Sequence, residues 1–109
     1  MVESFRNEKL IREISRQAAI FVGQNSNGTS LITVTNVVIS NNAKTGKVFV
    51  SVLPVHKEKA AMDFLKRQQK EFSSFLQKNI KTGQLPRLSF ELDLGEKNRQ
   101  RIEEISKKS

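Results

Sequence analysis

The chain has 109 residues, which predicts a single domain over residues 1–109, and it contains no cysteine. The missing cysteine excludes a disulfide-stapled fold, a thiolate zinc site and a cysteine nucleophile. Nineteen Lys and Arg residues against 11 Asp and Glu residues give a formal net charge of +8, which indicates a polyanionic partner, most often nucleic acid. No run approaches the ~20 apolar residues of a membrane span, and the first ten residues lack an apolar signal segment. We therefore expect a cytoplasmic protein with no membrane partner.

The first third of the chain predicts a helix followed by a hairpin. Apolar residues recur at steps of three and four over 5–22, which indicates a helix, and Gly23 is a candidate end for it. LITVTNVVIS (31–40) and KVFVSVLP (47–54) are rich in β-branched residues and predict two strands, with NNAKTG (41–46) as the loop between them. The apolar residues of the first strand change parity near Asn36, which indicates a bulge or burial on both faces.

The rest of the chain predicts a long helical stretch, one further strand and a last helix. Apolar residues form one stripe along residues 57–80, and Pro86 lies before the alternating stretch RLSFELD (87–93), which predicts the third strand. Residues 96–107 predict the last helix. Three strands form too small a sheet to need helices on both faces, so we expect an α+β fold with its helices packed on one face.

Candidate catalytic and metal-binding residues are few, and none forms a convincing site. His56 is the only histidine and follows Pro54, where a surface position is the simplest interpretation. Without a second histidine or a thiolate there is no zinc site, and Glu91 and Asp93 are explained by a solvated strand face. AKTGKV (43–48) lacks the earlier glycine and the later hydroxyl of a phosphate-binding loop. We expect no enzymatic activity, no metal, no cofactor and no small-molecule substrate.

Basic residues concentrate on the long helical stretch. Residues 57–81 contain seven Lys and Arg residues against three acidic residues, which favours phosphate contacts over a merely solvated face. Candidate RNA contacts there and on the third strand are Lys59, Lys66, Arg67, Lys70, Lys78, Lys81 and Arg87. Lys9, Arg12 and Arg16 share one face of the first helix and are second candidates. The chain has no Trp or Tyr, and its seven Phe residues fall mostly on core stripes, so we expect phosphate and shape contacts rather than base stacking.

From about residue 5 to 105 the ordered set of segments resembles the ribosome-binding factor A family, whose members act in maturation of the bacterial small ribosomal subunit. The matching segments are the opening helix, ITVTNVVIS (32–40), GKVFVSVL (46–53), the long helix, LPRLSFELD (85–93) and Arg101-Ile102. The resemblance implies a type II KH-like fold, α-β-β-α-α-β, in which an Ala-x-Gly kink replaces the GxxG loop of ordinary KH domains. Gln68, Gln69 and Lys70 stand at the matching positions, and Arg99 stands where the family usually has glycine.

The phase of the apolar stripe gives a separate reason to expect a kink. Leu65 and Phe72 are seven residues apart, so a straight helix would press Gln68 toward the core. A buried amide without a partner costs about 1–3 kcal/mol, which a bend would relieve. We therefore expect a deviation near residues 68–70, and one unbroken helix from 57 to 80 is the alternative.

The resemblance implies a monomeric, non-enzymatic assembly factor that binds the immature small subunit and its 16S rRNA. The alternative is a small ribosome-associated module held by protein contacts instead of rRNA contacts. Salt sensitivity separates the two, because phosphate contacts release counterions.

Overall fold

A computed structural model describes residues 2–25, 30–81 and 84–95 of the chain. Its elements follow the chain as α1 (Val2–Asn25), β1 (Leu31–Ile39), β2 (Thr45–Leu53), the 3-10 turn η1 (Val55–Lys57), α2 (Glu58–Arg67), α3 (Gln69–Asn79) and β3 (Arg87–Leu92). The order α-β-β-α-α-β confirms the type II KH-like expectation. The helix expected over 96–107, together with Arg99, lies outside the described residues.

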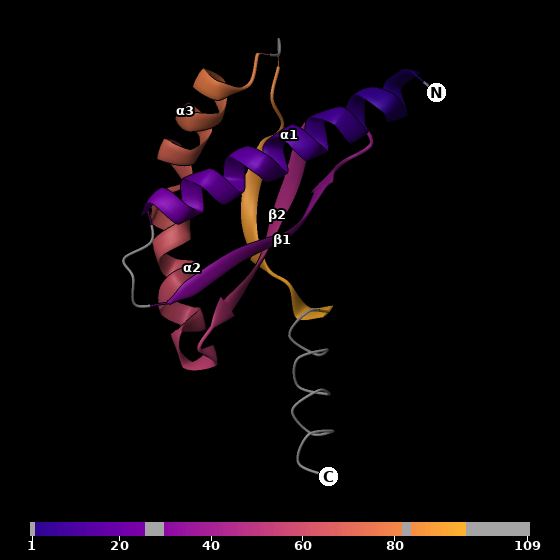
Figure 1. Ribbon diagram of the computed structural model, residues 1–109. Coiled ribbons are helices and arrows are strands. Elements are labelled where there is room, and N and C mark those ends of the chain that lie inside the picture. Colours follow the sequence, from indigo (N-terminus) through magenta and orange to yellow (C-terminus); the bar gives the residue numbers. More distant parts are fainter. Residues whose placement is uncertain (1, 26–29, 82–83, 96–109) are drawn as a thin grey trace.

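The described strands form one sheet in the order β1-β2-β3. β1 and β2 are an antiparallel hairpin, whereas β3 pairs parallel to β2 after the chain has passed through α2 and α3. Figure 1 shows α1 crossing the sheet, with α2 and α3 stacked beside β3. The buried side chains of β2 are Val48, Val50 and Val52, and the residues between them are not buried, so the helices cover one face of the sheet, as expected.

A bulge in β1 resolves the parity conflict near Asn36. Val34 pairs with Val50 and Asn36 pairs with Phe49, so Thr35 is an extra residue in the register. The extra residue reverses the alternation, and apolar side chains from both halves of β1 therefore reach the same core: Ile32, Val34, Val37 and Ile39. The expectation of a bulge is confirmed.

The core is built around phenylalanine side chains from three elements. Phe72 of α3 lies between Phe21 of α1 and Phe90 of β3, with ring centroids 5.2 and 4.8 Å away. Phe90 is 4% exposed and Leu88 is 3% exposed. The prediction that the apolar face of the third strand meets the helices is therefore confirmed.

The long helical stretch is broken at Gln68. α2 ends at Arg67 and α3 begins at Gln69, while Gln68 has φ −89° and ψ 9°. The Gln68 N–H still donates to Phe64 O, and the Gln68 carbonyl still accepts from the Phe72 N–H. The expected deviation near residues 68–70 is thus confirmed, as a one-residue turn between two helices whose apolar stripes share the same core.

Two expected boundaries are wrong. α1 continues through Gly23 to Asn25, because glycine inside a helix costs only about 1 kcal/mol and does not by itself end it. β2 begins at Thr45 instead of residue 47, because Gly46 pairs with Ile39 of β1 as well as with Leu88 of β3, and the Ser40 N–H donates to the Thr45 carbonyl. The hairpin loop is therefore shorter than its composition indicates.

Candidate nucleic-acid interface

The outer edge of β3 has no strand partner among the described residues, and it faces the break between α2 and α3. The Arg87 N–H donates to Lys44 O and the Asp93 N–H donates to Val50 O, so odd-numbered residues of β3 direct their amides toward β2. The backbone groups of the residues between them therefore point to the outer edge. There the side-chain amide of Gln69 donates a hydrogen bond to the Leu88 carbonyl.

The Gln69 contact explains how this chain keeps a helix break without Ala-x-Gly. Gln69 is the first residue of α3, and its hydrogen bond to Leu88 ties the start of that helix to β3. Neither Pro nor Gly is present at this break, so the contact to the β3 backbone is the one that holds the start of α3 in place. Gln68, which the helical phase predicted to face the core, is only half-buried at the turn.

A cleft of about 1140 Å³ lies along this edge, between the outer side of β3 and the two helices, and extends onto the sheet. Four cationic side chains line it: Lys47, Lys66, Lys70 and Arg87. Five hydroxyl side chains also line it: Ser40, Thr45, Ser73, Ser74 and Ser89. No Asp or Glu is among the described residues that line the cleft. Cations with hydroxyl donors and no carboxylate form a surface suited to a phosphate backbone.

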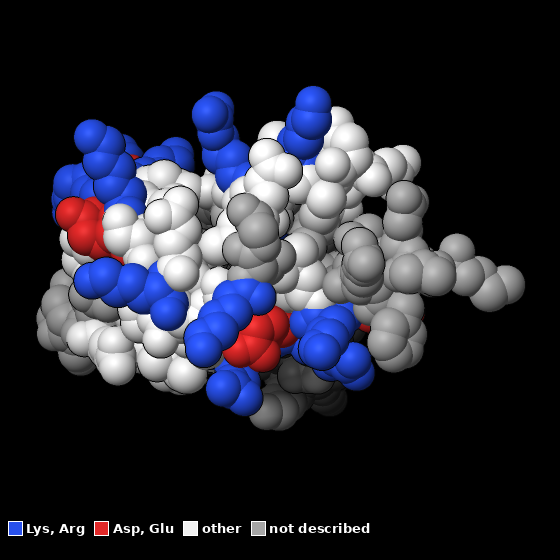
Figure 2. Space-filling view, turned by 90° about the horizontal axis from the view of Figure 1, so that it is seen from above, with Lys and Arg blue, Asp and Glu red and all other residues white. Residues whose placement is uncertain are grey.

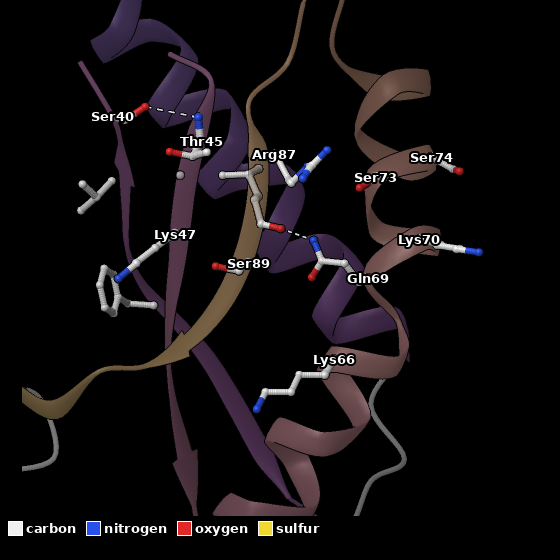
Figure 3. Close-up of a pocket in the computed structure, with 14 residues that line it drawn as sticks. Ser40, Thr45, Lys47, Lys66, Gln69, Lys70, Ser73, Ser74, Arg87 and Ser89 are labelled. Carbon is white, nitrogen blue, oxygen red and sulfur yellow. Dashed lines mark hydrogen bonds between the residues drawn. The ribbon is translucent and has the colours of Figure 1, made fainter. Parts of the chain in front are cut away.

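The cationic side chains approach the cleft from different elements. Figure 3 shows Lys66 of α2 reaching toward β3 and Arg87 of β3 reaching toward α3, so these two converge on the space between strand and helices. Lys70 lies on the rim, with its ammonium group directed away from β3. Ser73 is directed toward the strand and Ser74 away from it.

The structure brings together three of the ten basic residues that the sequence predicts as contacts. Lys66, Lys70 and Arg87 line the cleft, and all ten side chains are exposed. The other predicted residues of the long helical stretch lie outside the cleft: Lys59, Arg67, Lys78 and Lys81. Lys9, Arg12 and Arg16 are exposed on α1 and also lie outside it.

Lys47 is a cleft residue that the sequence analysis missed. It alternates with the buried Val48, which predicts a position on the outer face of the sheet. It pairs with Ser89 through the parallel β2–β3 register, and this long-range pairing places it beside the cleft. The alternation in the sequence therefore indicates that Lys47 is exposed, but it does not indicate which residues of other elements lie next to it.

Positive charge also extends beyond the cleft. Figure 2 shows the molecule from above the view of Figure 1, with Lys and Arg side chains distributed around this side and few Asp and Glu between them. This agrees with the formal net charge of +8 and makes long-range attraction of a polyanion independent of any single contact.

Two further kinds of feature are absent from the described residues. None of their helices is long and apolar enough to cross a membrane. No group of three or more His, Cys, Asp or Glu side chains in them could hold a metal ion. His56 lies exposed in η1, as expected.

Solved structures with this fold are similar to the chain. The crystal structure of ribosome-binding factor A from Thermus thermophilus has a TM-score of 0.70 and 23% sequence identity, covering 78% of this chain and 92% of that one. A solution structure of a Thermotoga maritima protein assigned to ribosome-binding factor A has a TM-score of 0.62 and 24% identity, covering 77% and 83%. A Thermus thermophilus ribosome-binding factor A homology model, fitted into a cryo-EM map of a 30S complex, has a TM-score of 0.66 and 23% identity, covering 74% and 88%.

The family assignment comes from the sequence itself. Among curated proteins, no relative matches the chain. A sequence model described as ribosome-binding factor A matches residues 5–106, nearly the whole length, and the element order of the structure agrees with it. The chain therefore belongs to the ribosome-binding factor A family.

Proposed function

We propose that this protein is a ribosome assembly factor that binds the immature small (30S) ribosomal subunit, contacts its 16S rRNA and promotes late maturation and rRNA processing. The observation that carries the proposal is the cleft between β3 and the α2–α3 break, with its four cationic side chains and no carboxylate among the described lining residues. The family membership and the Thermus relative described in a 30S complex support the choice of partner.

The proposed mechanism is electrostatic and needs no catalysis or cofactor. The net charge of +8 draws the monomeric protein to the rRNA in the cytoplasm, and the cleft then holds phosphate groups. Binding to one conformation of the maturing subunit raises the population of that conformation until a later step displaces the protein.

The proposed contacts have an order of importance. Lys47, Lys66, Lys70 and Arg87 come first, because the cleft brings them together. The remaining exposed basic residues of α2, α3 and the following turn come next, and those of α1 extend the attraction at longer range: Lys59, Arg67, Lys78, Lys81, Lys9, Arg12 and Arg16.

The test is binding of purified protein to immature small subunits, measured by co-sedimentation. The variant Lys66→Glu, Lys70→Glu, Arg87→Glu should bind much more weakly than the wild type, with an unchanged circular dichroism spectrum, because all three side chains are exposed. The matched variant Lys9→Glu, Arg12→Glu, Arg16→Glu changes the net charge equally but leaves the cleft intact. Equal weakening by the two variants would mean that net charge, and not the cleft, determines binding.

One observation favours the alternative of a module held by protein contacts. Leu31 and Leu53 are register partners at one end of the sheet and are 62% and 42% exposed, and the nearby Val55 is 51% exposed. Exposed apolar side chains grouped in this way are typical of a protein-contact surface. Small-subunit binding that tolerates high salt but is lost on Leu31→Ser, Leu53→Ser would favour this alternative over rRNA contact.

A further inference from the structure

Phe49 differs from the other phenylalanines whose side chains the structure describes. Phe21, Phe72 and Phe90 are buried, and Phe64 and Phe75 are partly buried against the core. Phe49 is half-buried but belongs neither to the core cluster nor to the side chains packed against it.

The strand pattern explains this position. Phe49 lies between Val48 and Val50 of β2, which are both fully buried against the helices, so its side chain projects from the opposite, open face of the sheet. It lines the same cleft as Lys66 and Arg87, at the part of the cleft that extends onto the sheet.

The surroundings of Phe49 combine apolar surface with positive charge on one side. Lys47 is two residues away on the same face of β2, flanked in the register by Val38 and Ser89. Val38 is 46% exposed and also lines the cleft. The register partners of Phe49 itself are Asn36 of β1 and Glu91 of β3. The exposed Glu91 carboxylate repels phosphate, so a phosphate next to Phe49 is disfavoured on the β3 side of the ring.

Contrary to the expectation of phosphate and shape contacts alone, we propose that Phe49 is a stacking platform for one unpaired base of the bound RNA, with the phosphate beside that base held by Lys47. The inference rests on the proposed function and specifies its ligand as a single-stranded segment. The base covers the half-buried aromatic side chain, and base–aromatic stacking accepts any of the four bases. The cationic cleft supplies the charge complementarity, and Glu91 directs the backbone toward the Lys47 side.

A single tryptophan reports on this contact directly, because the chain contains no Trp or Tyr. In Phe49→Trp, the fluorescence should be quenched by a short unpaired oligoribonucleotide, but not by inorganic polyphosphate, which carries charge without bases. The matched control is Phe64→Trp, since Phe64 is half-buried against the core and does not line the cleft. Its fluorescence should not respond to either ligand.

Loss of the ring provides a second readout that does not depend on a reporter. Phe49→Leu should weaken binding of the unpaired oligonucleotide about tenfold, in line with the loss of one stacked base, while Phe64→Leu leaves it unchanged. Binding of the blunt duplex made from the same strand and its complement should change little in either variant, because paired bases cannot stack on Phe49. Circular dichroism confirms that each variant is folded.

The outcomes separate this inference from the proposed function. Stacking is overturned if Phe49→Trp is not quenched while the oligonucleotide binds, or if Phe49→Leu keeps the full affinity; small-subunit binding by the wild type would then still support the proposed function. Wild-type protein that binds neither small subunits nor oligonucleotide would overturn both.

Discussion

At the scale of single residues, Gly46 and Gly23 differ in whether their surroundings leave room for a side chain. A Cβ atom added at Gly46 would lie 2.7 Å from the Leu88 side chain and 2.8 Å from the Val38 carbonyl oxygen. Gly46 therefore lets β1 and β3 approach β2 from both sides at the start of that strand. A Cβ atom added at Gly23 of α1 would meet nothing within 4 Å.

We expect Gly46→Ala to destabilise the protein by about 1–3 kcal/mol, because the carbonyl oxygen belongs to the backbone and cannot move away cheaply. Gly23→Ala is the matched change and should stabilise the protein by about 0.5–1 kcal/mol, because alanine restricts the unfolded chain and favours the helix. Urea unfolding monitored by circular dichroism measures both. Similar stabilities for the two variants would show that the strands around Gly46 can separate without cost.

At the scale of elements, the junction of α2 and α3 combines an expected feature with an unexpected contact. The phase of the apolar stripe predicts a break, because Leu65 and Phe72 both have to face the core and a straight helix would bring Gln68 with them. The residue that ties the junction to the sheet is its neighbour Gln69, which donates to the Leu88 carbonyl at the edge of β3. Gln69 and Leu88 both line the cleft, so the junction of the two helices forms part of its wall.

We expect Gln69→Ala to destabilise the protein by about 1 kcal/mol relative to Gln77→Ala, because it leaves the Leu88 carbonyl without its side-chain partner. Gln77 is an exposed residue of the same helix, so it corrects for the higher helix propensity of alanine. Unfolding free energies from urea titration measure the difference. Amide exchange across residues 66–73 should also become faster in Gln69→Ala only. Indistinguishable variants would mean that the break does not depend on this hydrogen bond.

At the scale of the whole molecule, the excess of positive charge and the cleft have different roles in the proposed function. The net charge of +8 acts over a distance and accelerates encounter with any polyanion. The cleft is lined by four cations, one each from β2, α2, α3 and β3. Direct contacts between such cations and phosphates release the counterions of the nucleic acid, whereas attraction at a distance does not.

The salt dependence of RNA binding should therefore identify the cleft. Each contact with a phosphate of a single strand contributes about 0.7 to the slope of log K against log salt. The variant Lys66→Glu, Lys70→Glu, Arg87→Glu should lower the magnitude of this slope by about 2, measured by fluorescence anisotropy of a labelled oligonucleotide over a salt series. The α1 triple variant should lower it less. Equal slopes for the wild type and the cleft variant would remove these three residues from the phosphate contacts.

Those features that follow from a repeating pattern were predictable from the sequence. The alternation of Leu88 and Phe90 places the face of β3 that meets the helices, and the change of parity in β1 predicts the bulge that the register shows between Val34 and Asn36. The helical phase predicts a deviation near residues 68–70, and the structure has the break at Gln68. Each inference needs only the periods of strand and helix, which are properties of the local backbone.

Features that depend on pairing between distant segments were decided by the tertiary structure. The parallel docking of β3 on β2 places Lys47 beside Ser89, although nothing near these residues in the sequence indicates it. The same pairing leaves the outer edge of β3 facing α2 and α3, so that Lys66, Lys70 and Arg87 share a cleft with Phe49, whereas the other seven predicted cations do not line it. The sequence alone determined which residues face the core and that the molecule carries an excess of positive charge. Which cations lie around one cleft depended on the path of the chain through α2 and α3, because that crossover determines the edge along which β3 pairs.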